Sequence, residues 1–166
     1  PFGGIVSTDF DSKGDAWLGS GLGGLIHFDG ITFTAYKKTD GLVSNLVRSV
    51  MVDGNDNKWV GTAEGISVVD QSNTNYTQHH RIFTLPAQDT INPVVDLIMD
   101  SHNRVWAGIY VDYLVTEGGL SMYEAGSWTD FDVNDGLIGP VVRGLAVDKS
   151  DNIWVATSSG VSKLSG

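Results

Sequence analysis

Aspartate and asparagine side chains recur in polar turns along the chain, and oxygen ligands for a cation are the first chemistry they suggest. The segment DGNDN (53–57) places two Asp and two Asn within five residues. Calcium, however, takes about six to eight oxygens, and this turn lacks the distal glutamate of a helix–loop–helix site. An aspartate in a tight turn can instead accept backbone N–H groups. We therefore expect no metal ion and no cofactor.

The histidines do not form a recognisable catalytic set. His79 and His80 are adjacent, and successive side chains on an extended chain point to opposite sides, so their imidazoles would not converge. The sequence has no cysteine, no HExxH motif, no serine-nucleophile elbow and no phosphate loop that leads into a helix. These observations favour a protein that is not an enzyme.

Two arginines share one place in a recurring pattern. Arg48 and Arg143 each lie five residues before an aspartate, Asp53 or Asp148. A guanidinium can bind a carboxylate or a sulfate through two parallel hydrogen bonds. The two arginines are therefore candidate ligand-binding residues, although pairing with an acid of a neighbouring unit is an equal alternative.

The elements that would position these residues follow from an internal repeat. Tryptophans recur along the chain, and each lies six residues after an aspartate. The pairs are Asp11 and Trp17, Asp53 and Trp59, Asp100 and Trp106, and Asp148 and Trp154. An apolar run precedes each Asp, and a second run begins at each Trp, which is typical of a β-hairpin with a polar turn. These eight residues are expected to be structural, with the indoles filling the space between adjacent units.

Each unit continues with a glycine and a third short strand, and then with a fourth strand expected at ITFTAYK (31–37), RIFTLP (81–86) and SWTDFDV (127–133). Four antiparallel strands repeated every 40 to 50 residues or so are typical of β-propeller blades. We therefore predict an all-β propeller segment over residues 1–166. The blades are expected at about 5–38, 47–87, 94–133 and 142–166, the last one incomplete. Such a set would be a partial ring or half of a larger propeller.

The connectors TDGLVSNLV (39–47) and NDGLIGPVV (134–142), together with the Asp–Trp pattern and a following glycine, carry a family resemblance. The chain resembles the two-component regulator propeller repeats. These repeats occur in the extracytoplasmic sensor regions of hybrid histidine kinases and their relatives. The resemblance implies a periplasmic or extracellular sensing module for signal transduction. A weaker resemblance links the hairpins to streptogramin lyases, which are propeller enzymes.

The third unit carries an insertion. Trp106 precedes its strand-three glycine, Gly119, by thirteen residues, where the other units have six. Loops that lengthen on one face of a repeat array often bind ligands. Tyr110, Asp112 and Tyr113 of this insertion are therefore candidate ligand-binding residues, with two aromatic rings and an acceptor. An alternative is that the insertion only covers the core or bridges to a partner chain.

Composition limits the partners. The formal net charge is −10 and the ten Lys and Arg are scattered, so we expect no nucleic-acid partner. No apolar stretch is long enough for a membrane span.

The expected function is non-catalytic recognition of a small molecule, such as a glycan fragment, or of a protein. The alternatives are a propeller lyase and a protein-binding scaffold, and a homodimer is a candidate for completing the ring.

Overall fold

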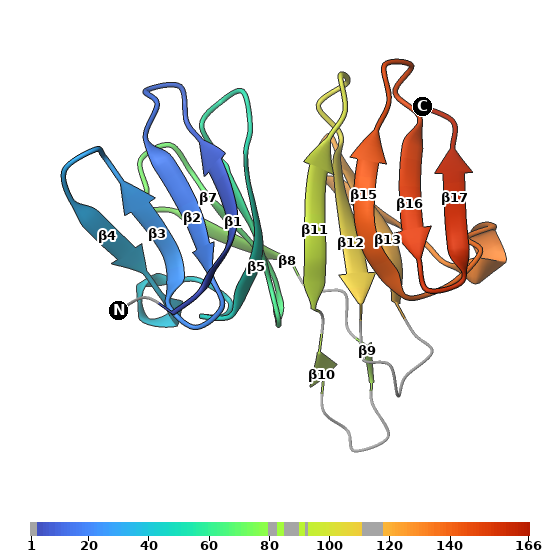
Figure 1. Ribbon diagram of the computed structural model, residues 1–166, viewed down its shortest axis with the longest axis horizontal. Helices are drawn as coiled ribbons and strands as arrows, with labels where there is room; N and C mark the ends of the chain where they lie inside the picture. The colour runs from blue at the N-terminus through green and yellow to red at the C-terminus, as the bar shows by residue number, and fades with distance from the viewer. Residues whose placement is uncertain (1–2, 80–82, 85–89, 92, 111–117) are drawn as a thin grey trace. The chain divides into compact units, whose positions relative to one another are not determined.

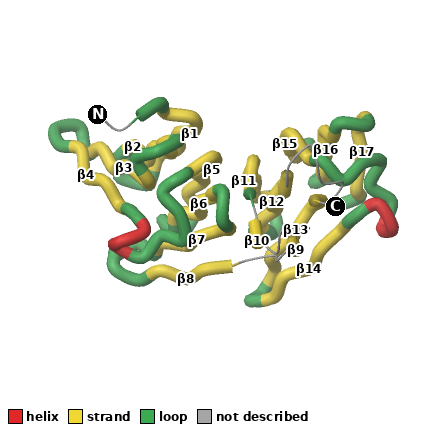
Figure 2. Tube along the Cα trace, turned by 90° about the horizontal axis from the view of Figure 1, so that it is seen from below, coloured by secondary structure: helices red, strands yellow, loops and turns green. Residues whose placement is uncertain are grey.

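The computed structural model describes residues 3–79, 83–84, 90–91, 93–110 and 118–166. Over these residues the chain consists of β-strands, turns and two short 3-10 segments, η1 (Lys38–Asp40) and η2 (Val133–Asp135). Figure 2 shows both segments in red on the connections between sheets. None of the described helices is long and apolar enough to cross a bilayer.

Four antiparallel sheets, here called blades one to four, follow one another along the chain (Figure 1). Blade one contains β1 (Ile5–Phe10), β2 (Ala16–Ser20), β3 (Gly24–Phe28) and β4 (Phe33–Tyr36). Blade two contains β5 (Val47–Val52), β6 (Lys58–Thr62), β7 (Gly65–Val69) and β8 (Tyr76–His79). Blade three contains β11 (Val94–Met99), β12 (Val105–Tyr110), β13 (Gly118–Glu124) and β14 (Ser127–Phe131). Blade four contains β15 (Val142–Val147), β16 (Ile153–Thr157) and β17 (Gly160–Leu164).

The strands in each blade pair in sequence order, so every blade is a simple meander. Three of these sheets have four strands and the last has three, which confirms the predicted all-β blade architecture with an incomplete final blade. A further short pair joins β9 (Phe83–Thr84) to β10 (Thr90–Ile91).

The outer strand of blade two does not lie where the sequence predicted it. It was expected at RIFTLP (81–86), but the strand that pairs with β7 is β8, and Phe83 pairs with Ile91 instead. The reason lies in the turn after β7. Asp70 accepts hydrogen bonds from the backbone N–H and hydroxyl of Ser72 and from the Asn75 side chain, and this closes the turn just before β8.

The repeated aspartate organises the first hairpin of every blade. One carboxylate oxygen accepts the backbone N–H groups of the residues two and four positions later, at 2.9–3.0 Å. The other oxygen accepts the indole N–H of the repeated tryptophan at 2.9–3.1 Å. The carboxylate therefore ties the turn to the second strand and fixes the direction of the indole ring.

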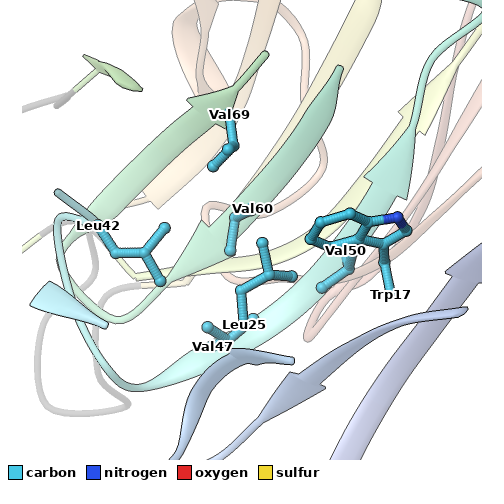
Figure 3. Packing of buried hydrophobic residues seen from close by; sticks show 7 residues of the cluster. All are labelled: Trp17, Leu25, Leu42, Val47, Val50, Val60 and Val69. Carbon is cyan, nitrogen blue, oxygen red and sulfur yellow. The ribbon is translucent and has the colours of Figure 1, made fainter. Parts of the chain in front are cut away.

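The chain divides into two compact units, residues 1–82 and 83–166, and each contains a pair of blades. In the first unit, Trp17 lies in a buried cluster with residues of both blades, shown in Figure 3. Its members are Trp17, Leu25, Leu42, Val47, Val50, Val60 and Val69. In the second unit, Trp106 lies in the corresponding cluster with Leu120, Leu137, Val142, Ile153 and Val155.

Close backbone approach makes the blade pairs tight. A Cβ atom on Gly19 would lie 2.8 Å from Cγ1 of Val47, and one on Gly108 would lie 2.7 Å from Cγ1 of Val142. Glycine is therefore required at the centre of both second strands, where the first strand of the next blade packs. The two units use the same packing device.

The four repeated tryptophans are not equally buried. Trp17, Trp59 and Trp106 are 1%, 6% and 3% exposed, whereas Trp154 is 40% exposed. All four donate the same indole hydrogen bond, so they share one role in the hairpin. They differ in how much apolar surface they bury, and the expectation that they are interchangeable therefore holds only for the hydrogen bond.

We expect Trp106→Ala to lower the free energy of unfolding of the second unit by about 3–5 kcal/mol, because it empties a buried indole site. Trp154→Ala should lower it by about 1–2 kcal/mol, because the indole is already partly in water. Urea unfolding followed by circular dichroism measures both. Equal losses for the two variants would contradict this assignment.

Asp100 offers a test of the charge in these turns. Its side chain is 0% exposed, and the Arg104 Nε donates to it at 2.6 Å. Burial acts to raise the pKa of Asp100, but hydrogen bonds from Trp106 and Arg104 outweigh it, so the pKa lies below the ordinary value. We expect Asp100→Asn to cost about 2–3 kcal/mol at neutral pH, because Arg104 loses its anionic partner.

This cost should depend on pH in a defined direction. A carboxyl whose folded pKa is lowered contributes stability above its unfolded pKa, about 3.9, and loses it as the pH falls through the folded pKa. The difference between Asp100→Asn and the parent should therefore be full above about pH 4 and shrink in stronger acid. Urea midpoints measured across this range check it, and a difference that stays constant down to the acid end would be inconsistent.

Candidate functional site

The candidate arginines lie on β-bulges. In every blade the register of the first strand shifts by one residue near its start, between Ile5 and Ser7, Val47 and Ser49, Val94 and Asp96, and Val142 and Gly144. The bulged residue has no partner in the ladder, so its side chain can be re-aimed. Arg48 and Arg143 are the bulged residues of blades two and four, and both are exposed.

In the second unit the bulge brings two of the predicted residues together. The guanidinium of Arg143 lies over the Tyr110 ring, with its carbon 5.9 Å from the ring centroid. Tyr110 is the last residue of β12 and donates its backbone N–H to the Pro93 carbonyl at 3.1 Å. A cation held over an aromatic face gives a surface that can recognise both a charged and a planar group.

The start of β13 lies close to the connector into blade four. Gly118, the first residue of β13, has a φ of +148°, and a Cβ atom there would lie 2.4 Å from the Pro140 carbonyl oxygen. Pro140 belongs to the connector that leads into β15. The start of β13, which pairs with Tyr110, therefore lies against the connector that leads to Arg143.

The matching connector of the first unit carries a polar network. Lys38 Nζ lies 2.8 Å from the Glu64 carboxylate, and the Ser44 hydroxyl donates to the same carboxylate at 3.0 Å. These residues lie on the connector into blade two and on the β6–β7 turn. The first unit thus has an ion pair on its connector, whereas the second has Arg143 over an aromatic ring.

The structure brings some of the predicted site residues together and leaves others undescribed. Tyr110 and Arg143 are in contact. Arg48 belongs to the first unit, whereas Tyr110 and Arg143 belong to the second. Asp112 and Tyr113 lie outside the described residues, so their proposed role stays a prediction.

Sequence reasoning missed one polar cluster in blade one. His27 on β3 lies 2.9 Å from the Asp15 carboxylate and stacks on Trp17, with ring centroids 4.4 Å apart. The sequence did carry a signal for it. The residue four positions after the repeated aspartate is Asn57, Arg104 or Asn152 in the other blades, but it is an acid, Asp15, in blade one.

Two of the described histidines lie close to an aspartate. His27 contacts Asp15, and His102 Nδ1 lies 3.4 Å from Asp151. In both of these pairs the partner acid is an aspartate of a turn between the first two strands of a blade.

No known family model and no curated protein sequence matches the chain. Solved structures do. The extracellular domain of the putative hybrid two-component system BT3049 from B. thetaiotaomicron is 19% identical, with a TM-score of 0.76 over 97% of this chain and 21% of that one. A streptogramin B lyase is 11% identical, with a TM-score of 0.68 over 100% of this chain and 56% of the enzyme.

A third similar structure is PorZ, a bacterial surface component of the type-IX secretion system of Porphyromonas gingivalis. It is 15% identical, with a TM-score of 0.66 over 98% of this chain and 24% of that one. The chain thus spans about a fifth of the two-component domain and about a quarter of PorZ. At these identities the likeness shows the fold, and this chain is built of propeller blades like those in the extracellular domains of hybrid two-component systems.

Proposed function

We propose that the chain is a non-catalytic recognition module in the sensing region of a signal-transduction protein. The observation that carries the proposal is the structural likeness to the extracellular domain of BT3049, which extends over 97% of the chain with a TM-score of 0.76. The connectors that resemble two-component regulator repeats support the same reading. On this proposal the module works outside the cytoplasm, in the periplasm or at the cell surface.

The ligand class follows from the second unit. Arg143 offers an exposed guanidinium, and Tyr110 offers a ring beneath it. A guanidinium binds carboxylate and sulfate groups bidentately, and an aromatic ring packs against a sugar ring. An oligosaccharide that carries uronate or sulfate groups fits this combination best.

Two alternative functions remain as outcomes of the test. The likeness to a streptogramin B lyase raises a lyase activity, and the likeness to PorZ raises a scaffold that binds protein. Turnover of a lactone or uronide by the purified chain would favour the lyase. A homodimer that binds its ligand only as a dimer would instead place the site across two copies.

We expect the chain to bind acidic oligosaccharides and not their neutral counterparts, and Arg143→Ala to weaken this binding by about tenfold or more. A charge-assisted hydrogen bond is worth about 1.5–3 kcal/mol, and 1.4 kcal/mol is tenfold in affinity. Calorimetry with a panel of uronate-bearing, sulfated and neutral oligosaccharides measures it. The melting temperature should stay the same, because Arg143 is exposed.

Lys149→Ala is the matched control. It removes an exposed cation from the same blade, but from the turn that follows β15, whereas Arg143 lies at the start of that strand. Equal weakening by both variants would show general charge attraction and not a site. Failure of the parent to bind any member of the panel would remove the ligand class.

A further inference from the structure

The position four residues after the repeated aspartate supplies a hydrogen-bond donor in three blades. Nδ2 of Asn57 donates to Asp53 at 2.9 Å, Nε of Arg104 donates to Asp100 at 2.6 Å, and Nδ2 of Asn152 donates to Asp148 at 2.9 Å. Each donor brings a positive dipole or a full charge to the carboxylate.

Blade one places an acid at this position. Asp15 follows Asp11 by four residues, and an ionised carboxylate can only accept hydrogen bonds. Two like charges at this separation repel each other unless a cation lies between or beside them. At this position blade one therefore lacks the donor that blade three supplies with Arg104.

An imidazole completes the cluster. His27 Nε2 lies 2.9 Å from Oδ2 of Asp15, and the ligand atoms of Asp11, Asp15 and His27 all lie within 4.8 Å of one another. The imidazole is held on one side by stacking against Trp17. Three side chains that belong to one hairpin and its neighbouring strand thus point their ligand atoms at one small volume.

A cavity of about 80 Å³ lies at this cluster. Besides the three ligand residues, its lining includes Lys13, Asp56, Lys58 and Asn73. The Oδ1 atom of Asn73 is buried and accepts no hydrogen bond from the described part of the chain. Asn73 thus adds an unpartnered polar side chain to a lining that holds three carboxylates and an imidazole, and such a lining favours a ligand with positive charge.

One of the two lysines in the cavity wall donates its hydrogen bonds to backbone carbonyl oxygens. Lys58 is 2% exposed, and its ammonium group donates to the carbonyl oxygens of Asp56 and Asp70 at 3.0 and 2.7 Å. It also lies 4.6 Å from the centroid of the Trp17 ring. Lys58 and Lys13 together balance fewer charges than the lining carboxylates Asp11, Asp15 and Asp56 carry.

We propose that blade one holds a divalent metal ion between Asp11, Asp15 and His27. One imidazole nitrogen with two carboxylates suits the borderline cation Zn²⁺ better than Ca²⁺ or Mg²⁺, and the harder Mn²⁺ serves as a comparison. The metal takes the place that the Arg104 guanidinium has in blade three. The sequence analysis predicted no metal because it treated the aspartates as acceptors of backbone N–H groups, and it did not connect His27 with Asp15, twelve residues away.

This site does not depend on the proposed function. Its two acids belong to the turn between β1 and β2, whereas Tyr110 and Arg143 belong to the second unit. A metal here would fix the turn of blade one, as the Arg104 ion pair does in blade three. Failure of ligand binding at Arg143 would leave it untouched.

The test is calorimetry of ZnCl₂ and MnCl₂ with the tag-free, EDTA-treated chain. We expect one saturable site that Asp15→Asn and His27→Gln each weaken by more than about tenfold, since loss of even an outer partner of a metal ligand costs about 10–100-fold. Asp15→Asn gives blade one the residue that blades two and four have, so its metal-free melting temperature should equal or exceed that of the parent. Zn²⁺ should raise the melting temperature of the parent and not of this variant.

Two controls separate this site from other metal binding. Asn152→Asp creates the same pair of acids in blade four without an imidazole, and it should add no site. His102→Ala removes the other histidine–aspartate pair and should leave the titration unchanged. Binding lost in His102→Ala, binding retained in Asp15→Asn, or no saturable binding in the parent would each overturn the proposal.

Discussion

The whole fold depends on one carboxylate that is used four times. In each blade the repeated aspartate binds two backbone N–H groups of its own turn and the indole N–H of the tryptophan six residues later. The hydrogen bond joins residues that are close in sequence. It also affects packing between blades, because the indole that it orients reaches the neighbouring blade. Trp17 and Trp106 connect the hairpin chemistry to the buried clusters of the two units in this way. A turn, a strand pair and an interface between blades therefore rest on one side chain.

This dependence explains how much could be predicted from the sequence. The hydrogen bond from the indole to the carboxylate requires a constant spacing of six residues between Asp and Trp. This spacing is visible in the sequence, so the hairpins and the blade architecture could be predicted from it. The outer strand of blade two was predicted at the wrong place. Asp70 closes a longer turn than those before β4 and β14, and residues 83–84 do form a short strand, but one that pairs with residues 90–91. Arg143 and Tyr110 were each predicted to be ligand-binding residues, but their contact with each other was not predicted. The Asp15–His27 pair was missed because it joins neighbouring strands, and only comparison of the four turns shows that Asp15 is unusual.

The two ends of the blades carry different constraints. At the Asp–Trp end, side chains are engaged in bonds within and between blades. Ser12 donates its backbone N–H to Asp56 at 2.8 Å in the first unit, and Ser101 donates to Asp151 at 3.0 Å in the second. Each unit therefore has the same link between its two turns. At the opposite end the same two units differ, with an ion pair of Lys38 and Glu64 in one and a Tyr110 ring in the other.

The bulge at the start of each first strand gives a physical reason for that difference. A residue inside a ladder must suit its partners on both sides, whereas a bulged residue has no ladder partner and its side chain is not specified by strand pairing. The four bulged positions are Val6, Arg48, Val95 and Arg143, which differ in charge and polarity while the surrounding register is the same. Substitution there changes the surface without changing the blade. A recognition function built on Arg143 is therefore compatible with the fold, because the fold places this residue without using it.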